Sequence, residues 1–358
     1  MRSAAVAGGI LLMAIVLWDA FETIILSRRV SRKLRLTRLF YGITWGPWRS
    51  LARNMRPGNS RENYLAVFGP LSLIVLLVTW GTGLVLAFAL LQFGIGTRLA
   101  ADAQTGGFFA YLYLSGSTFF TLGYGDITPL TSPGRAVAVV ESGTGFAFLA
   151  LVIGYLPTLS QAYSKREVNV TLLDARAGSP PTAAELLRRH GGESAELVEL
   201  FSEWERWSAE LLESHVSFPV LAYFRSQHDN QSWVAGLTTI LDTCALVMAG
   251  MQGAPVAAAR LTFAMARHAV VDLARVFSPE TTGGTTRRLT PADLALLRER
   301  LEGDGVSLRG GEETDARLQE LRAMYEPYAE ALSSHLLMPL PAWVPPAGAP
   351  DNWQRLEE

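Results

Sequence analysis

Three long apolar stretches mark the first half of the chain, at residues 4–26, 64–93 and 134–160. A helix needs about 20 residues to cross the hydrocarbon core of a bilayer, and each stretch is long enough. Arg2 ahead of the first stretch is also typical of a signal peptide, but no small-residue cleavage site follows. The pattern therefore predicts three transmembrane helices, with a signal peptide as the alternative for the first.

From Lys165 onward, apolar positions recur with the period of amphipathic helices. Start signals and breaks rich in Ser, Pro and Gly separate these helices. They are expected at 182–190, 194–216, 231–251, 254–278, 291–302 and 314–336. No run of residues is typical of a strand, so the chain is predicted to be all-α, with a membrane part and a water-soluble part.

The segment from Ser232 to Met251 is apolar enough to be considered as a fourth span. Asp242 lies in its middle, and an unpaired charge is costly in a membrane. The following helix is also rich in charge, with Arg260, Arg267, His268, Asp272 and Arg275. A buried core helix is therefore favoured over a span.

The formal net charge of −2 hides an asymmetry along the chain. Ten Arg or Lys stand against one acid between Ser27 and Asn63, whereas 18 basic and 27 acidic residues follow from Lys165 on. Basic residues beside spans collect on the cytoplasmic side. The block that decides the orientation is Arg28, Arg29, Arg32, Lys33, Arg35 and Arg38. It predicts a multi-pass protein of the cell membrane with its N-terminus outside and its C-terminal half in the cytoplasm, and not a nucleic-acid-binding protein.

Apolar and aromatic residues interleave with the cations after this block. They are Leu39, Phe40, Ile43, Trp45 and Trp48. The pattern is typical of a helix that lies at the membrane interface. A plain linker is the alternative.

The segment Gly107 to Phe120 is apolar but too short to cross a membrane, so it is expected to re-enter as a short helix. The loop behind it has glycines at 123 and 125, which adopt backbone angles that other residues resist. Carbonyl oxygens of such a loop can replace the water around K⁺, and the C-terminal end of the preceding helix favours a cation. The proposed ion-binding residues are Thr121, Leu122, Gly123, Tyr124 and Gly125, with the Thr121 hydroxyl at the inner end.

Together with Asp126, this loop resembles the filter Thr-Val-Gly-Tyr-Gly-Asp of the potassium-channel superfamily, with Leu122 in place of valine. The resemblance is to the bacterial two-transmembrane pore module and covers about residues 64–163. It implies a potassium-selective channel of four identical subunits in a lipid bilayer, with K⁺ as the permeant ion. Since Leu122 and Ser117 depart from the family, a poorly selective cation channel is a variant of this hypothesis.

Residues around the loop are expected to support it. Ser117 stands where some family members carry a carboxylate that pairs with the acid after the filter. Asp126 lacks that partner, and Tyr113 is the candidate substitute. Glu141 is expected to support the loop from behind through Ser115 or Ser117, in either a structural or a regulatory role.

The inner span is expected to begin at Ser132 and Pro133, a helix cap and a first-turn proline. Gly145 stands where the family places a hinge, although a glycine also permits close helix packing. The family alignment places Phe146, Leu149 and Ile153 on a water-filled cavity and Pro157 near the inner mouth. An apolar constriction there could gate by dewetting.

Asp19 and Glu22 lie one turn apart in the first span. Intramembrane carboxylates are candidates for function. The alternative is that they pair with Arg28, Arg29 or a neighbouring helix near the interface. The span has no arginine at every third position, so it does not resemble a voltage sensor.

A weak polar cluster occurs in the soluble part: Glu213, His215, His228, Asp229, Asp242, His268 and Asp272. His268 and Asp272 are one helical turn apart and could chelate a metal. Their spacing matches no established site, so ordinary core and surface residues are favoured and no metal besides K⁺ is expected.

No nucleotide-binding, P-loop or hydrolase motif occurs, and the single Cys244 excludes a disulfide framework. The chain is therefore predicted not to be an enzyme and to need no cofactor. The expected organisation is an extra span (1–27), a basic linker (28–63), a pore domain (64–163), a helical cytoplasmic regulatory domain (164–338) and a Pro-rich tail (339–358).

The function hypothesis is a potassium channel gated by its cytoplasmic domain, with an unknown cytoplasmic ligand as a partner. The alternative is a membrane-anchored signalling receptor or enzyme that uses the pore module as a scaffold.

Overall fold

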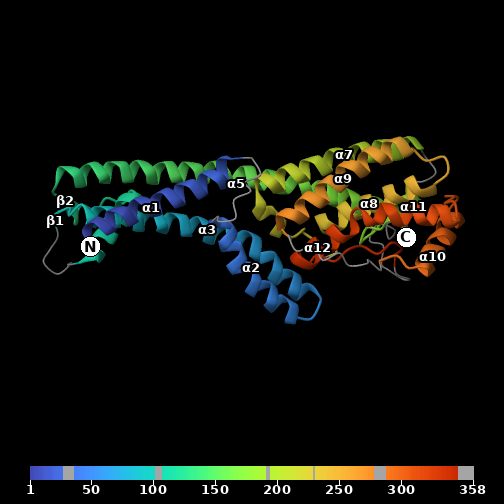
Figure 1. The fold of residues 1–358 in the computed structure, drawn as a ribbon, viewed down its shortest axis with the longest axis horizontal. Coiled ribbons are helices and arrows are strands. Elements are labelled where there is room, and N and C mark those ends of the chain that lie inside the picture. Colours follow the sequence, from blue (N-terminus) through green and yellow to red (C-terminus); the bar gives the residue numbers. More distant parts are fainter. Residues whose placement is uncertain (27–35, 101–106, 191–193, 229, 278–287, 346–358) are drawn as a thin grey trace, which may run out of the picture. The chain divides into compact units, whose positions relative to one another are not determined.

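A computed structural model covers the chain and describes residues 1–26, 36–100, 107–190, 194–228, 230–277 and 288–345. The chain forms two compact units (Figure 1). We call Met1–Leu51 and Val67–Gln161 the membrane unit. Ala52–Ala66 and Ala162–Glu358 are called the cytoplasmic unit, after the location that the sequence predicts for them. Several residues discussed above lie outside the described part: Arg28, Arg29, Arg32, Lys33, Arg35 and Asp229.

The membrane unit is helical. Its helices are α1 (Arg2–Ala20), continued by the π-helical segment η1 (Phe21–Ile25), then α2 (Leu36–Asn54), α3 (Asn59–Gly94), α4 (Phe108–Phe119) and α5 (Ser132–Ala177). One end each of α2, α3 and α5 belongs to the cytoplasmic unit. Helix α1 together with η1, helix α3 and helix α5 are each long and apolar enough to cross a membrane. Two short strands, β1 (Leu99–Ala100) and β2 (Thr128–Pro129), pair antiparallel. The predicted all-α fold is confirmed, and the three predicted spans are among the helices that are long and apolar enough to cross a membrane.

Helix α1 packs closely against α3 (Figure 1). A Cβ added at Gly9 would lie 2.7 Å from the carbonyl oxygen of Ala87. A Cβ at Gly94 would lie 2.6 Å from the side chain of Val6. Small residues at such contacts let membrane helices approach each other. The N-terminal span is therefore an integral part of this unit.

Residues Leu36–Asn54 form helix α2, so this region is not the plain linker that was the alternative prediction. The rings of Tyr41 and Trp45 are buried, and the Trp45 ring centroid lies 4.7 Å from that of Phe68 on α3. Leu39 and Ile43 are exposed. The helix therefore presents one aromatic face to α3 and leaves apolar side chains uncovered, as expected for a helix at a membrane interface.

The cytoplasmic unit contains seven further α-helices in its described part. They are α6 (Ala183–His190), α7 (Ser194–Ser217), α8 (Trp233–Gly250), α9 (Val256–Phe277), α10 (Pro291–Gly303), α11 (Glu312–Ala323) and α12 (Glu326–Leu336). A 3₁₀ helix, η2 (Pro219–Tyr223), follows α7.

The single helix predicted at 314–336 was wrong, because the chain breaks between α11 and α12. Tyr325 leaves the helical conformation, with φ −135° and ψ −34°. Its buried ring packs on Phe263 with the centroids 5.9 Å apart, and its hydroxyl donates to Asp242 at 2.5 Å. Contacts with the core thus override the helical periodicity of the segment.

Helix α8 is the core of the cytoplasmic unit. Every residue from Trp233 to Val247 is buried, and the helix packs against α6, α9, α11 and α12. Its length and composition would also allow a membrane span. The burial of this helix within the unit favours the core-helix interpretation.

Asp242 is held by a buried network at the centre of this core. Arg288 Nη2 donates to its carboxylate at 2.6 Å. The guanidinium groups of Arg288 and Arg322 lie 5.7 and 5.4 Å from the ring centroid of the buried Trp343. These contacts fasten the chain around Trp343 to the helices as an irregular strap. Asp242 therefore has a structural partner within the protein.

Candidate functional site

The 121–125 loop begins where α4 ends. The carbonyl oxygen of Ser117 accepts a hydrogen bond from the amide of Leu122 at 2.8 Å and is 3.4 Å from the amide of Gly123. The last turn of α4 therefore fixes the start of the loop. All five residues of the loop are exposed in the single chain.

The loop uses left-handed backbone conformations. Gly123 has φ +59° and Gly125 has φ +80°, where L side chains are strained. The glycines thus occupy the conformation for which the sequence analysis expected them. Thr121 also has a positive φ, +57°, which the sequence did not predict.

The outer end of the loop is held by a polar and an apolar contact. The Tyr113 hydroxyl donates to Asp126 Oδ2 at 2.9 Å, the pairing expected from the absence of a carboxylate at Ser117. The adjacent Ile127 is buried in a small cluster with Ala110 and Leu114 of α4. These contacts tie the end of the loop to the helix at its start.

Glu141 of α5 lies behind α4 and is fully buried. Its Oε1 forms a hydrogen bond with the Ser115 hydroxyl, so Ser115 and not Ser117 is the partner seen for its side chain. The same hydroxyl lies 2.7 Å from the carbonyl oxygen of Val85 on α3. One side chain of α4 thus joins the helices before and after it.

Gly145 lies directly against the backbone of α4. A Cβ there would be 2.0 Å from the carbonyl oxygen of Phe119. The rings of Phe119 and Phe148 also approach, with centroids 5.9 Å apart. Of the two roles considered for Gly145, close packing is the one visible in this structure, and a hinge stays a prediction.

A second polar network behind α4 was missed in the sequence. The buried Gln92 donates to the carbonyl oxygen of Gly134 at 2.9 Å and accepts from the Thr97 hydroxyl at 2.6 Å. Tyr111 of α4 donates to the carbonyl oxygen of Thr97 at 2.7 Å. The sequence offered one sign of this network, the amide side chain of Gln92 inside an apolar span. Such a side chain favours a hydrogen bond between helices.

The start of α5 differs by one residue from the prediction. Ser132 is already helical, and the hydroxyl of Thr131 accepts from the amide of Gly134 at 3.3 Å. Thr131 therefore caps the helix and Pro133 follows in the first turn. Boundaries inferred from sequence commonly shift by one or two residues.

The predicted cavity-lining residues share an uncovered apolar face of α5. Phe146, Leu149 and Ile153 are all exposed in the single chain. Pro157 lies inside the helix and supplies no amide hydrogen to the preceding turn. The described part of one chain does not cover this face.

The carboxylates of the first span bind neighbouring side chains. Asp19 accepts from the Thr37 hydroxyl at 2.6 Å, from the Thr37 amide at 3.2 Å and from Trp80 Nε1 at 3.0 Å. Glu22 accepts from Trp18 Nε1 at 2.7 Å. Asp19 therefore links α1 to the start of α2 and to α3, which agrees with pairing to a neighbouring helix.

The polar cluster of the cytoplasmic unit does not form a metal site in the described residues, where no three His, Cys, Asp or Glu side chains come together. The His215 Nε2 lies 3.3 Å from Arg166 Nη1, and its Nδ1 donates to the carbonyl oxygen of Leu211 at 2.9 Å. Burial, followed by the charge of Arg166, holds the pKa of His215 well below its ordinary value. The exposed His268 pairs with the buried Asp272 at 3.4 Å. His228 is also exposed.

Arg166 is a residue that the sequence analysis missed. It is buried near the C-terminal end of α5 and donates to the carbonyl oxygens of Leu221 and Phe224, each at 2.9 Å. Tyr163 of the same helix donates to the carbonyl oxygen of Arg225 at 3.0 Å. The C-terminal third of α5 is therefore fastened to the η2 region of the cytoplasmic unit.

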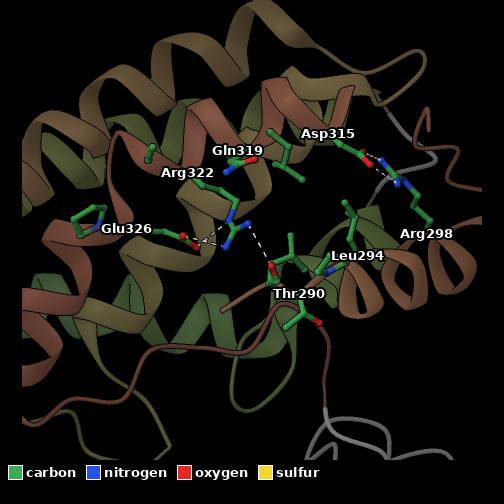
Figure 2. A pocket seen from close by; sticks show the side chains of 12 residues that line it. Thr290, Leu294, Arg298, Asp315, Gln319, Arg322 and Glu326 are labelled. Carbon is green, nitrogen blue, oxygen red and sulfur yellow. Dashed lines mark hydrogen bonds and ion pairs between the residues drawn. The ribbon is translucent and has the colours of Figure 1, made fainter. Parts of the chain in front are cut away.

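A cavity of about 500 Å³ opens between α10, α11 and the start of α12 (Figure 2). Arg298 pairs with Asp315 at one end, and Arg322 Nε donates to Glu326 at 3.1 Å at the other. Leucine side chains line the space between them, with Gln319 at the rim. Cavities of this size accept small organic molecules.

Residues 73–160 match a protein-family model described as an ion channel. The match begins in α3, includes α4 and the 121–125 loop, and ends in α5. No curated protein and no solved structure matches the chain. The chain therefore carries an ion-channel domain. Together with the apolar helices, this domain defines an all-α, multi-pass membrane channel.

Proposed function

We propose that this chain is the subunit of a potassium-selective channel in which four copies surround one ion pathway. The observation that carries the proposal is the 121–125 loop, which follows a short helix within the ion-channel domain and has glycines at positive φ. Backbone carbonyls from such loops can replace the hydration shell of K⁺. The C-terminal end of α4 adds a partial negative charge that favours a cation nearby.

The tetramer is supported by what a single chain leaves uncovered. Leu122 is 56%, Tyr124 70% and Phe146 69% exposed, although each belongs to the ion-channel domain. Large apolar groups gathered in this way are typical of an interface. One loop also supplies only part of a ring of oxygens, so a cation site on a central axis needs several copies.

Gating by the cytoplasmic unit is supported by the continuity of α5. This helix begins beside the 121–125 loop, carries the Gly145 contact to α4, and reaches Ala177 without a break. Arg166 fixes its later part to the cytoplasmic unit. A ligand in the cavity between α10 and α11 would bias the gate through this helix. The basic residues after the first span support a cytoplasmic location for this unit and an external N-terminus in a cell membrane.

Removing residues 172–358 should leave a folded tetramer with an intact ion pathway and altered opening. The deletion removes most of the cytoplasmic unit, including η2, to which Arg166 binds, but none of the residues that contact the 121–125 loop. Single-channel recording of the truncated and full chains measures the change in open probability. If both open and close alike in every condition tested, the unit serves assembly or localisation instead.

Potassium flux from liposomes that contain only the purified protein tests the proposal. Flux should appear with the wild-type chain, and protein-free liposomes with an added potassium ionophore report their integrity. Absence of flux from folded tetramers, including the truncated form, would favour the alternative of a membrane-anchored receptor or enzyme that uses the module as a scaffold.

A further inference from the structure

We propose that Glu141 is protonated and donates a hydrogen bond to the Ser115 hydroxyl, and that loss of this proton alters conduction through the 121–125 loop. The site is a proton-binding site within the membrane unit. The part of this inference that concerns conduction rests on the proposed function. The protonation of Glu141 stands on its own geometry.

The first step is a count of hydrogens. The Ser115 hydroxyl carries one hydrogen and can donate one hydrogen bond. It lies at hydrogen-bonding distance from two oxygens, the carbonyl of Val85 at 2.7 Å and Oε1 of Glu141. The Val85 carbonyl can only accept. If Glu141 were ionised, one of these two acceptors would face a lone pair of Ser115. A protonated Glu141 completes the chain from its own O–H to Ser115 and from Ser115 to Val85.

The surroundings of Glu141 favour the same protonation state. The residue is fully buried, and its Oε2 has no hydrogen-bond partner in the described part of the chain. The group bound to it is the Ser115 hydroxyl of α4, which also meets the Val85 carbonyl of α3, and neither of these groups carries a charge. Asp126, the acid that follows the 121–125 loop, is bound to Tyr113. Burying a charge without a partner is costly, whereas a neutral carboxyl group needs only the donor bond that Ser115 accepts.

The position of this bond connects it to the loop. Ser115 and Phe119 lie one turn apart on α4, and the residues they meet on α5, Glu141 and Gly145, are also one turn apart. The two helices therefore meet along two successive turns. The carbonyl oxygen of Ser117, between the two contacts, holds the amide of Leu122. Ionisation of Glu141 would remove its donated hydrogen bond and place a negative charge next to the Ser115 hydroxyl oxygen. We expect this to shift α4 at the start of the 121–125 loop.

The variant Glu141→Gln tests the inference, because a glutamine amide donates to Ser115 but does not titrate. In liposomes, potassium flux through the wild-type protein should change as the pH is raised, while Glu141→Gln should keep the low-pH behaviour throughout. Glu22→Gln is the matched control. It alters a buried carboxylate on η1 and should keep the wild-type pH dependence. A wild-type flux that does not change with pH, or a Glu141→Gln flux that changes as the wild type does, would overturn the link to conduction.

Infrared difference spectroscopy of the purified protein reads the proton directly and does not require conduction. The wild type at neutral pH should show the carbonyl stretch of a protonated carboxyl group, shifted in Ser115→Ala and missing in Glu141→Gln. No difference in this band between wild type and Glu141→Gln would overturn the protonation. If the band is present but the wild type carries no potassium, the proposed function fails and the proton site remains.

Discussion

Replacing Gly123 by alanine should abolish potassium conduction while leaving the protein folded. Gly123 has φ +59°, and no atom lies within 4 Å of the position that a Cβ would take in the single chain. The obstacle is therefore conformational. A residue with a Cβ in the left-handed region costs about 1–2 kcal/mol, and four copies would bear this cost around one ring of oxygens. Liposome flux measures the loss, and size-exclusion chromatography shows whether the tetramer persists.

Thr121→Ala is the matched control within the same loop. Thr121 also has a positive φ, +57°, but alanine adds no Cβ there and removes only the hydroxyl. In this variant, ion occupancy of the loop and block by barium should both weaken. Potassium flux should be reduced less. A folded Gly123→Ala tetramer that carries potassium at the wild-type rate, with unchanged discrimination against sodium, would show that ions take another route.

Replacing Gly145 by alanine should have the second largest effect. The added Cβ would lie 2.0 Å from the carbonyl oxygen of Phe119 and 2.9 Å from its carbonyl carbon. These are backbone atoms at the end of α4, so the clash cannot be relieved by a side-chain rotation. Overpacking of this kind costs about 1–3 kcal/mol. We expect a lower thermal stability of the purified protein and an altered open probability, because α4 and α5 must separate beside the 121–125 loop.

Gly143→Ala distinguishes packing from a general effect of stiffening the helix. Nothing lies within 4 Å of a Cβ at Gly143, which is two residues away on the same helix. Its thermal stability and conduction should stay near those of the wild type. Equal behaviour of the two alanine variants would contradict the packing role of Gly145 and would indicate a general effect of stiffening the helix.

The parts of this fold that the sequence predicted are those with local causes. Span length, hydropathy and the spacing of glycines depend on the residues themselves, so the first two apolar helices and the helix before the loop were predicted within a few residues of their observed limits. The start of α5 was also predicted, but this helix continues beyond the predicted residue 160 to Ala177. Tyr113 could be named as a partner of Asp126 because both flank one short loop. Gly123 could be named because few other residues adopt its backbone conformation.

The parts that the sequence did not predict depend on contacts between distant segments. Thr37 and Trp80 bind Asp19 from positions 18 and 61 residues away. Arg166 reaches carbonyl oxygens more than 50 residues further on. The weak metal hypothesis failed for the same reason. The sequence analysis placed His215 and Asp242 in one polar cluster. In the folded chain His215 contacts Arg166, and Asp242 forms an ion pair with Arg288.

The reversal potential under bi-ionic conditions tests the central claim most directly. The purified wild-type protein would be placed in a planar bilayer with K⁺ on one side and Na⁺ on the other. A potassium-selective pathway through the 121–125 loop predicts a current carried by K⁺ and a reversal potential displaced far toward the value for a potassium-only membrane. A current that reverses near zero would contradict the account, because it would show a pathway that does not distinguish the two ions.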